Sequence, residues 1–425
     1  MDIRTQNLKN FLDASHSVYH AVDYIAKALN NAGYTRLDEG ETWELELGGK
    51  YFLTRGGSTV LAFRVPNVTP KGFMMTASHS DRPTFKVKDH SNLVGTYTRL
   101  SVEKYGGMLM APWLDRPLSI AGRALIETEN GVESRLIDLD RDLLLIPNVA
   151  IHMNRKANDG YFWNAAVDTL PLVGSSEAAG KVQEALNEAA GGKMLGHDLF
   201  LYVREKASVW GLEEEYISAQ GLDDLQCAWG CTQGFLNSSE SESIPMLCVF
   251  DSEEVGSSSA QGANSQLLET TLERICLSLK LDMGALLRHS FMVSADNAHA
   301  IHPNHPEFAD PANAPVINKG VVLKFNADQR YTTDGISAAL FRKVCAKANV
   351  PVQTYYNRAD IMGGWTLGHL SLSHVSIPTA DVGLPQLGMH SCYETAGVKD
   401  SLYFEEAIAA LYSSTLTVSG DQYYI

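Results

Sequence analysis

Long apolar runs, paired cysteines and an excess of basic residues are all missing from this sequence. No stretch reaches the ~18 apolar residues of a membrane-spanning helix, and the first residues, MDIRTQNLKNFLDA, lack the apolar core of a secretory signal. The six cysteines form no Cys-x-x-Cys motif, and most lie within apolar runs. These absences predict buried, reduced thiols in a cytoplasmic protein that does not enter a membrane.

Acidic residues outnumber basic ones. The chain has 34 Lys and Arg against 50 Asp and Glu, for a net charge of −16. Such a surface repels phosphate groups, so nucleic acids and anionic membrane surfaces are not expected as partners. Hydrophobic residues at 45% and charged residues at 20% are values of globular chains, and 425 residues predict two or three domains.

The order of predicted elements indicates an α/β fold. Apolar spacing predicts one helix from Leu8 to Ala32, and alternation predicts strands that end in a buried strand at 72–78. From residue 219 onward, buried strands alternate with helices. This alternation is typical of a sheet covered by helices on both faces. The early strands are expected at 43–49, 50–55 and 58–65.

The stretch between these two parts has a different texture. Residues 89–218 contain short strands, an Asn-Gly turn signal and a weakly hydrophobic excursion at 174–198, which we expect to be a loop or a frayed helix. The sequence therefore predicts a catalytic domain in two parts, 1–88 and 219–425, interrupted by a β-rich inserted domain at 89–218.

Polar side chains follow several of the predicted buried strands. Ligand sites in open α/β sheets lie outside the carboxyl ends of strands, so residues that end different strands converge on one place. The residues in such positions are His79, Asp81, Asp251, Glu253, Glu254, Asp296 and Asp381, with His390 shortly after the last of them.

Two local patterns among these residues suit a metal site. A metal-bound histidine usually donates its second N–H to a carboxylate, and Asp81 lies two residues after His79 on the same side of an extended chain. The adjacent Glu253 and Glu254 would repel each other unless cations separate them. Such a pair suits one metal ligand and one general base.

Other candidates have alternatives that position alone leaves open. Asp223 in GLDDL is either a ligand or a helix N-cap. His299 and His302 behind Asp296 are expected to fix loops rather than bind metal. His390 follows a loop rich in Pro and Gly, which would present its ring.

Together the candidate ligands are two imidazoles and three carboxylates, from His79, Asp223, Glu254, Asp296 and His390. Imidazole with carboxylate suits zinc, and also cobalt or manganese. The set predicts two divalent metal ions per chain and a hydrolase that activates water.

Longer strings carry a resemblance to a known family. The strings SHSDRPTFKVK (78–88), FDSEEVGSSSAQGA (250–263), SADNAHAIHPNH (294–305) and LPQLGMHS (384–391) resemble the aspartyl aminopeptidase family of co-catalytic zinc metallopeptidases, which includes the vacuolar aminopeptidase I type. The likeness runs along almost the whole chain. It implies an α/β catalytic domain with an inserted β-domain for subunit contact, and assembly into tetrahedral dodecamers.

The resemblance also implies roles for single residues. It assigns His79 and Asp296 to a first metal site, Glu254 and His390 to a second, Asp223 to the bridge between them, Asp81 to the orientation of His79, and Glu253 to the general base. His152 matches a histidine that acts in a neighbouring subunit's active site, and Lys324 matches a lysine near the substrate side chain.

Two departures from the family's usual pattern are present. Asp224 stands where many relatives have Asn, and Ser252 replaces the usual Asn before the glutamate pair. Neither removes a ligand.

The expected activity is removal of an N-terminal residue from peptides. Lys324 favours an acidic residue, Asp or Glu, and its alternative is a solvated lysine or a structural partner of a carboxylate. A family member that prefers neutral residues, a deacylase of N-acyl amino acids and a non-enzymatic assembly protein are the competing functions.

Overall fold

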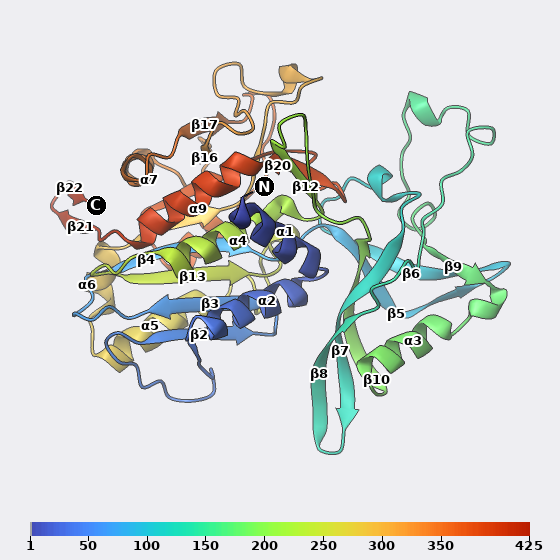
Figure 1. Ribbon diagram of the computed structural model, residues 1–425, viewed down its shortest axis with the longest axis horizontal. Coiled ribbons are helices and arrows are strands. Elements are labelled where there is room, and N and C mark those ends of the chain that lie inside the picture. The colour runs from blue at the N-terminus through green and yellow to red at the C-terminus, as the bar shows by residue number, and fades with distance from the viewer. Residues whose placement is uncertain (1) are drawn as a thin grey trace.

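The computed structural model describes residues 2–425, apart from the side chain of Leu372. Its largest element is a nine-stranded mixed sheet in the order β1-β2-β3-β13-β4-β14-β18-β16-β17. Figure 1 shows this sheet on the left of the molecule. Its strands are β1 (Thr35–Arg36), β2 (Lys50–Arg55), β3 (Thr59–Arg64), β4 (Phe73–His79), β13 (Ile244–Phe250), β14 (Phe291–Ala295), β16 (Val321–Phe325), β17 (Val352–Tyr356) and β18 (Thr379–Gly383).

Helices cover both faces of this sheet, as the sequence predicts. One face packs against α1 (Ile3–Ala14), α2 (Val18–Asn31), α4 (Leu222–Asn237), α7 (Gly335–Lys347) and α9 (Val398–Tyr412). The other packs against α5 (Leu267–Leu279), α6 (Met283–Arg288) and α8 (Leu367–His374). The α/β fold class with a mixed sheet is therefore confirmed.

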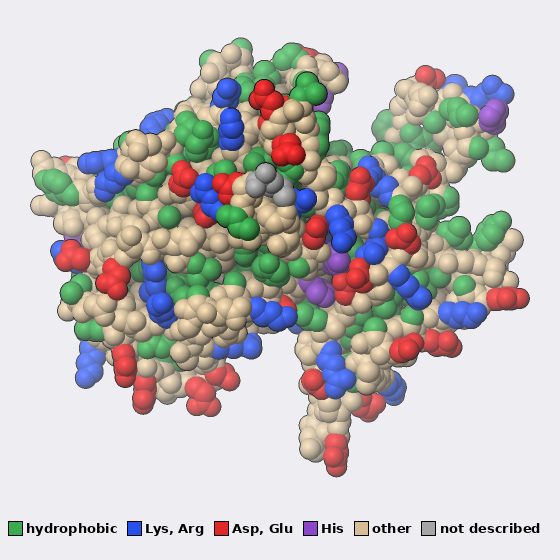
Figure 2. All heavy atoms as spheres, viewed as in Figure 1, with side chains coloured by type: hydrophobic (Ala, Val, Ile, Leu, Met, Phe, Trp, Pro, Cys, Tyr) green, Lys and Arg blue, Asp and Glu red, His purple; other side chains and the backbone are tan. Residues whose placement is uncertain are grey.

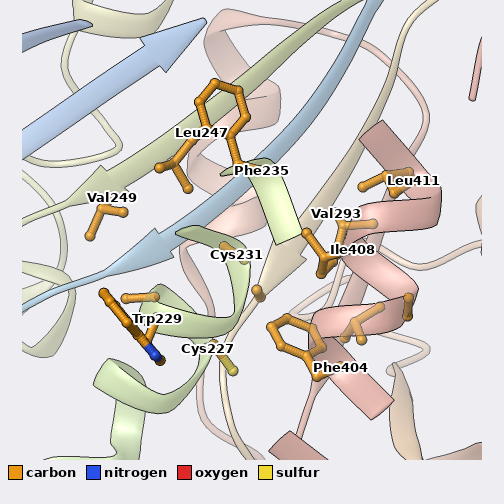
Figure 3. Close-up of a cluster of buried hydrophobic side chains, with 14 of the residues drawn as sticks. Cys227, Trp229, Cys231, Phe235, Leu247, Val249, Val293, Phe404, Ile408 and Leu411 are labelled. Atoms are coloured by element: carbon orange, nitrogen blue, oxygen red, sulfur yellow. The ribbon is translucent and has the colours of Figure 1, made fainter. Parts of the chain in front are cut away.

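Alternation along the central strands divides the core between the two faces. Met74 of β4 packs with the first group of helices and Met75 with the second. Leu247 and Cys248 of β13 divide in the same way, because successive side chains of a strand point to opposite faces. Figure 3 shows the first side, where cysteines and aromatic rings of α4 meet α9 and the sheet.

A six-stranded sheet forms a second body on the right of Figure 1. Its order is β8-β7-β10-β5-β6-β9, and it has a separate hydrophobic core that includes one face of α3 (Lys181–Ala190). The predicted domain boundary at residue 88 falls within β5. The strands are β5 (Thr84–Val94), β6 (Tyr97–Tyr105), β7 (Leu118–Thr128), β8 (Gly131–Asp138), β9 (Leu172–Ser175) and β10 (Met194–Val203).

The remaining strands lie in two smaller sheets. A five-stranded sheet has the order β11-β12-β20-β19-β15, and a hairpin pairs β21 with β22. The bounds are β11 (Ser208–Trp210), β12 (Tyr216–Ala219), β15 (Ala298–His299), β19 (Pro385–Leu387), β20 (Glu394–Gly397), β21 (Thr417–Ser419) and β22 (Gln422–Tyr424).

Two local expectations are wrong, and a third is only partly right. The helix predicted from Leu8 to Ala32 is two helices, because the Ser17 side chain caps a new start at α2. The strand expected at 43–49 is irregular: its Leu45 N–H bonds the Ser278 hydroxyl rather than a neighbouring strand. The excursion at 174–198, expected to be a loop or a frayed helix, contains the helix α3, which packs firmly enough to bury Val182 and Leu186.

The six cysteines are all free and buried, as predicted. Among residues 2–425, no helix is long and apolar enough to cross a membrane.

Candidate metal centre

Three neighbouring parallel strands end beside one another and carry the first candidate ligands. His79 is the last residue of β4 and lies in register with Phe250, the last residue of β13. Glu253 and Glu254 follow in a short 3-10 turn, and Asp296 directly follows β14. The convergence expected from the strand ends is therefore present in the fold.

The candidate ligand atoms form groups that share Asp223. One carboxylate oxygen of Asp223 lies 3.7 Å from His79 Nε2, and the other lies 3.4 Å from His390 Nε2. His390 Nε2 is also 3.4 Å from Glu254 Oε2. Asp296 joins His79 and Asp223 in a group whose ligand atoms all lie within 4.8 Å of one another. One carboxylate thus faces two histidines, one with each of its oxygens.

Asp223 is not a helix N-cap. It lies in the first turn of α4, where Gly221 is the capping residue and no side chain makes the capping hydrogen bond. Its Oδ1 and the Oε1 of Glu254 are buried and have no hydrogen-bond partner among the described residues. Buried polar atoms are normally satisfied, so these two oxygens fit a positively charged group that would lie between the ligands.

The electrostatics of the site fit cations as well. Burial raises the pKa of Glu254 well above its usual range, and the neighbouring Asp223 raises it further. Burial and the carboxylates of Asp296 and Asp81 raise the pKa of Glu253 to about 8, although His79 opposes them. A metal-free cluster of this kind concentrates negative charge that divalent ions would neutralise.

Asp81 fixes the orientation of the first histidine and of the glutamate turn. Its Oδ1 lies 3.3 Å from His79 Nδ1 and accepts a hydrogen bond from the Glu253 N–H at 3.1 Å. Its Oδ2 accepts from the Glu254 N–H at 3.2 Å and from the Tyr105 hydroxyl at 2.7 Å. His79 Nδ1 also makes a hydrogen bond with the Asp81 backbone carbonyl at 3.1 Å, so the carbonyl and the carboxylate of Asp81 together direct His79 Nε2 towards the cluster.

Glu394 is a structural partner of the site that the sequence did not reveal. Its two carboxylate oxygens accept hydrogen bonds from the backbone N–H groups of His390 at 2.6 Å and Asp223 at 3.1 Å. It is almost fully buried at the start of β20. No motif marks it, because it lies 171 residues from one of its partners.

The two departures from the family pattern lie beside the site. Asp224 is fully buried, and its Oδ2 accepts a hydrogen bond from the His79 N–H at 3.2 Å. Ser252 adopts a left-handed φ of 66°, a conformation that Asn also tolerates better than most residues. Its hydroxyl accepts a hydrogen bond from Ser259.

Lys324 lies in the wall of the site with its ammonium group engaged. Nζ donates to the backbone carbonyls of Asp296 at 2.7 Å and Asn297 at 3.3 Å, and lies 3.4 Å from Asp296 Oδ1. Burial alone would lower the pKa of Lys324, but the carboxylates of Asp296 and Asp381 more than offset this and raise it. Lys324 is thus a partner of a candidate ligand.

Three predicted site residues lie apart from the ligand cluster, and the first of them, Asp251, lines a separate cavity of about 190 Å³. His152 is exposed in the long excursion between β8 and β9 and does not line the cavity that contains the ligands of its own chain. Asp381 lies inside β18 and accepts hydrogen bonds from the backbone and hydroxyl groups of Thr332. It therefore supports the wall of the site rather than joining the ligands.

A cavity of about 760 Å³ opens over the ligands. His79, Asp223, Glu253, Glu254, Asp296 and His390 form its polar floor. Its wall includes His299 and the rings of Tyr331, Tyr355 and Trp365. A polar floor under an aromatic wall suits a small organic substrate held over reactive groups.

Comparisons with known proteins agree with this geometry. Residues 11–412 match the family described as "Aminopeptidase I zinc metalloprotease (M18)". A protein of Clostridium novyi named "Probable M18 family aminopeptidase 2" is 40% identical over 422 residues, covering 96% of this chain and 98% of the relative. A protein of the same name from Pseudomonas savastanoi is 38% identical, covering 96% and 97%.

Solved structures share the fold. A chain in "Cryo-EM structure of the Ape4 and Nbr1 complex" superimposes with a TM-score of 0.92 at 34% identity, covering 96% of this chain and 85% of that one. A chain in "Structure of S. cerevesiae mApe1 dodecamer" has a TM-score of 0.85 at 26% identity, covering 96% of each chain. The chain belongs to the M18 family of aminopeptidase I zinc metalloproteases, and it is an aminopeptidase that hydrolyses peptide bonds.

Proposed function

We propose that this aminopeptidase uses two divalent metal ions to remove the N-terminal residue of peptides. The proposed ions are zinc, with cobalt or manganese as replacements. The observation that carries the proposal is the position of Asp223, whose two oxygens face His79 and His390. His79 and Asp296 would hold one ion, and Glu254 and His390 the other. Bound ions of this kind polarise a carbonyl group and make water more acidic.

The protein's own residues supply the proton transfer. Glu253 lies on the cavity floor, and its backbone N–H is held by Asp81. As general base, its carboxylate takes a proton from the attacking water and then passes that proton to the leaving amine nitrogen. Asp81 keeps this glutamate turn and His79 in a fixed relation during both transfers.

The base assignment is tested by Glu253→Gln. The amide has nearly the same shape but cannot accept the proton, so turnover should fall by about two orders of magnitude or more. Metal content should stay at the wild-type level, because Glu253 is not one of the five proposed ligands. A variant with near-wild-type turnover would contradict the role of Glu253.

An acidic N-terminal residue is the proposed preference. Lys324 supports it, since it puts a positive charge in the cavity wall. Two of its hydrogen bonds go to backbone carbonyls, so a substrate carboxylate would share the ammonium group with Asp296. Cleavage of dipeptides beginning with Asp, Glu or Leu tests the preference, and faster cleavage of the Leu peptide would refute it. Faster cleavage of an N-acetylated peptide would instead favour a deacylase.

We also propose that residues 89–218 form an assembly domain and that the chain forms a tetrahedral dodecamer. The excursion between β8 and β9 projects from the molecule at the upper right of Figure 2 with hydrophobic side chains on its surface. Met153 is 85% exposed and Phe162 is 99% exposed, and His152 directly precedes Met153 in the same excursion. A large exposed apolar patch of this kind is typical of a subunit contact.

His152 would then act in the site of a neighbouring copy, where it would stabilise the negative charge that develops on the substrate oxygen. Size-exclusion chromatography with light scattering, followed by an activity assay of each fraction, tests this. We expect activity only in the assembled fraction. A fully active monomer would refute the action of His152 in a neighbouring subunit.

A further inference from the structure

The chain that leaves the six-stranded sheet at the end of β6 contacts both halves of the metal centre. We call residues 105–109 the β6 exit segment. The proposed ligands come from the nine-stranded sheet, from α4 and from the loop before β20, whereas this segment extends from the other body of the molecule. Its contacts therefore link the six-stranded sheet to the site within one chain.

The first contact is the hydroxyl group of Tyr105. It donates a hydrogen bond to Asp81 Oδ2 at 2.7 Å, beside the bond that the same oxygen accepts from Glu254 N–H. The Tyr105 ring packs edge-on against Phe200 of β10 with ring centroids 5.6 Å apart, in a small apolar cluster with Val18 and Tyr19 of α2 that fixes its direction. Because Asp81 orients His79, Tyr105 acts on the His79 half of the centre, and through the shared Oδ2 it also lies beside the Glu254 backbone.

The second contact is made by Gly106 and Glu254. Gly106 has a φ of +76°, and a Cβ added to it would lie 3.1 Å from Glu254 Cβ and 3.4 Å from the Glu254 carbonyl oxygen. The segment thus packs closely against the backbone carbonyl and the Cβ atom of Glu254. A larger residue here would push against that ligand.

The third contact fixes His390. The Gly107 carbonyl accepts a hydrogen bond from His390 Nδ1, and the Leu109 N–H donates to the His390 carbonyl at 3.0 Å. A hydrogen bond from Nδ1 leaves Nε2 unprotonated and directed at Asp223 and Glu254, which is the tautomer that a metal ligand needs.

We propose that the β6 exit segment is a positioning element for both metal ions. Tyr105 holds the His79 half through Asp81, and Gly106 with Gly107 holds the half formed by Glu254 and His390. The inference rests on the proposed two-metal function and deepens it. It gives the six-stranded sheet a role in the site of its own chain, in addition to any contact between subunits.

Tyr105→Phe tests the first half, since it removes one oxygen atom and keeps the ring. Loss of a hydrogen bond that orients a ligand typically costs ~10–100-fold in metal affinity or activity. We expect the affinity for one of two zinc ions, measured by competition with a chelator, to fall by that factor, with kcat reduced more than KM is changed. Unchanged zinc affinity would overturn the role of Tyr105.

Tyr202→Phe is the matched control. Tyr202 is also buried on the six-stranded sheet, and its hydroxyl donates to a carboxylate, Asp138, at 2.8 Å without contacting the metal centre. It should lose stability as Tyr105→Phe does, while zinc affinity and kcat stay at wild-type values. If both variants lost zinc affinity equally, a general loss of stability would explain the effect and the inference would be wrong.

Gly106→Ala tests the second half, with Gly180→Ala as its control. The two glycines have similar φ values, +76° and +79°, but a Cβ at Gly180 would meet nothing within 4 Å. Backbone strain is therefore matched, and only Gly106→Ala should weaken zinc binding. Equal zinc affinities in the two variants would overturn the role of Gly106.

Double variants separate the two halves. In a His79→Ala background the first ion is already weakened, so adding Tyr105→Phe should lower zinc affinity less than it does in the wild type. In a His390→Ala background the same change should have its full effect. The opposite pattern would overturn the assignment of Tyr105 to the His79 half. A wild-type chain that binds no zinc would overturn the proposed function itself, whereas unchanged variants of a zinc-binding wild type would overturn only this inference.

Discussion

Replacement of Lys324 by methionine removes a buried positive charge from beside a proposed ligand. The side chains of Lys324 and Asp296 are only 3% and 11% exposed, and Nζ lies 3.4 Å from Asp296 Oδ1. Methionine keeps most of the length and apolar surface of lysine but leaves Asp296 without its cation. The variant therefore removes the charge, together with the two hydrogen bonds that Nζ donates to the carbonyls of Asp296 and Asn297.

The magnitude follows from this geometry. Two unit charges 3.4 Å apart attract by about 5 kcal/mol at an effective dielectric constant of about 20. Removal of one partner of a buried pair costs about 3–5 kcal/mol, because the other charge stays buried. We expect the metal-free variant to lose about this much free energy of unfolding. With metal bound, a divalent ion compensates Asp296, so the loss should be smaller.

The difference between the two losses has a second consequence. By thermodynamic linkage, a change that destabilises the metal-free chain more than the loaded chain tightens metal binding, by tenfold for every ~1.4 kcal/mol. Lys324→Met should therefore bind zinc more tightly than the wild type. This is an unusual direction for a substitution in an active site, and it depends on the ion pair.

Urea unfolding at fixed chain concentration, with and without zinc, measures both losses. Lys86→Met is the control, because Lys86 pairs with Asp198 at 2.8 Å but its side chain is 35% exposed. That pair should contribute about 1 kcal/mol or less to the free energy of unfolding, whether or not zinc is present. Equal losses for Lys324→Met with and without zinc would refute the compensation of Asp296 by the metal.

Further outcomes are expected at four places in the molecule. Glu394→Gln should weaken zinc binding ~10–100-fold in chelator competition, because the amide accepts at only one of the two N–H groups that Glu394 now satisfies; unchanged affinity would contradict that role. His152→Ala should lower kcat but leave the assembly size, measured by light scattering, unchanged. When His152→Ala chains are mixed and reassembled with Glu253→Gln chains, part of the activity should return. Dialysis against a chelator should abolish turnover and lower the melting temperature, and zinc should restore both; turnover that survives complete metal removal would contradict a metal-dependent reaction. Burial lowers the pKa of His20 from 6.5 to about 4, so His20 binds a proton less readily in the folded chain than in the unfolded chain. The free energy of unfolding should therefore fall as the pH drops from 6.5 to 4. A His20→Gln variant with the same pH dependence would show that other groups cause the fall.

The candidate ligands could be predicted because the chemistry follows the ends of strands. His79 and Asp296 each end or follow a buried parallel strand, and parallel strands bring their carboxyl ends to one edge of a sheet. The apolar runs that precede these residues are visible in the sequence. The fold class alone is therefore enough to predict that these residues converge.

The supporting residues could not be predicted in this way. Tyr105 reaches Asp81 from another sheet, and Glu394 reaches the Asp223 backbone from a separate strand. A single Tyr or Glu carries no local pattern that distinguishes it from a surface residue. These contacts depend on how two sheets pack, which periodicity does not describe.

Local errors in the predicted elements have two different origins. The apolar spacing from Leu8 to Ala32 is continuous, but the Ser17 side chain starts a second helix within it. The weakly hydrophobic stretch at 174–198 forms α3 because Val182 and Leu186 find a buried surface on the six-stranded sheet. The first error thus comes from a local capping residue, and the second from tertiary packing that overrides local propensity.

The central claim is that Asp223 joins two metal ions in one site, and metal stoichiometry tests it most directly. The zinc content per chain should be measured by mass spectrometry for the wild type and for Asp223→Asn after dialysis at a fixed free zinc concentration. We expect two zinc ions per wild-type chain and loss of both ions, rather than one, from the variant. A single ion in the wild type, or two ions retained by Asp223→Asn, would contradict the shared site.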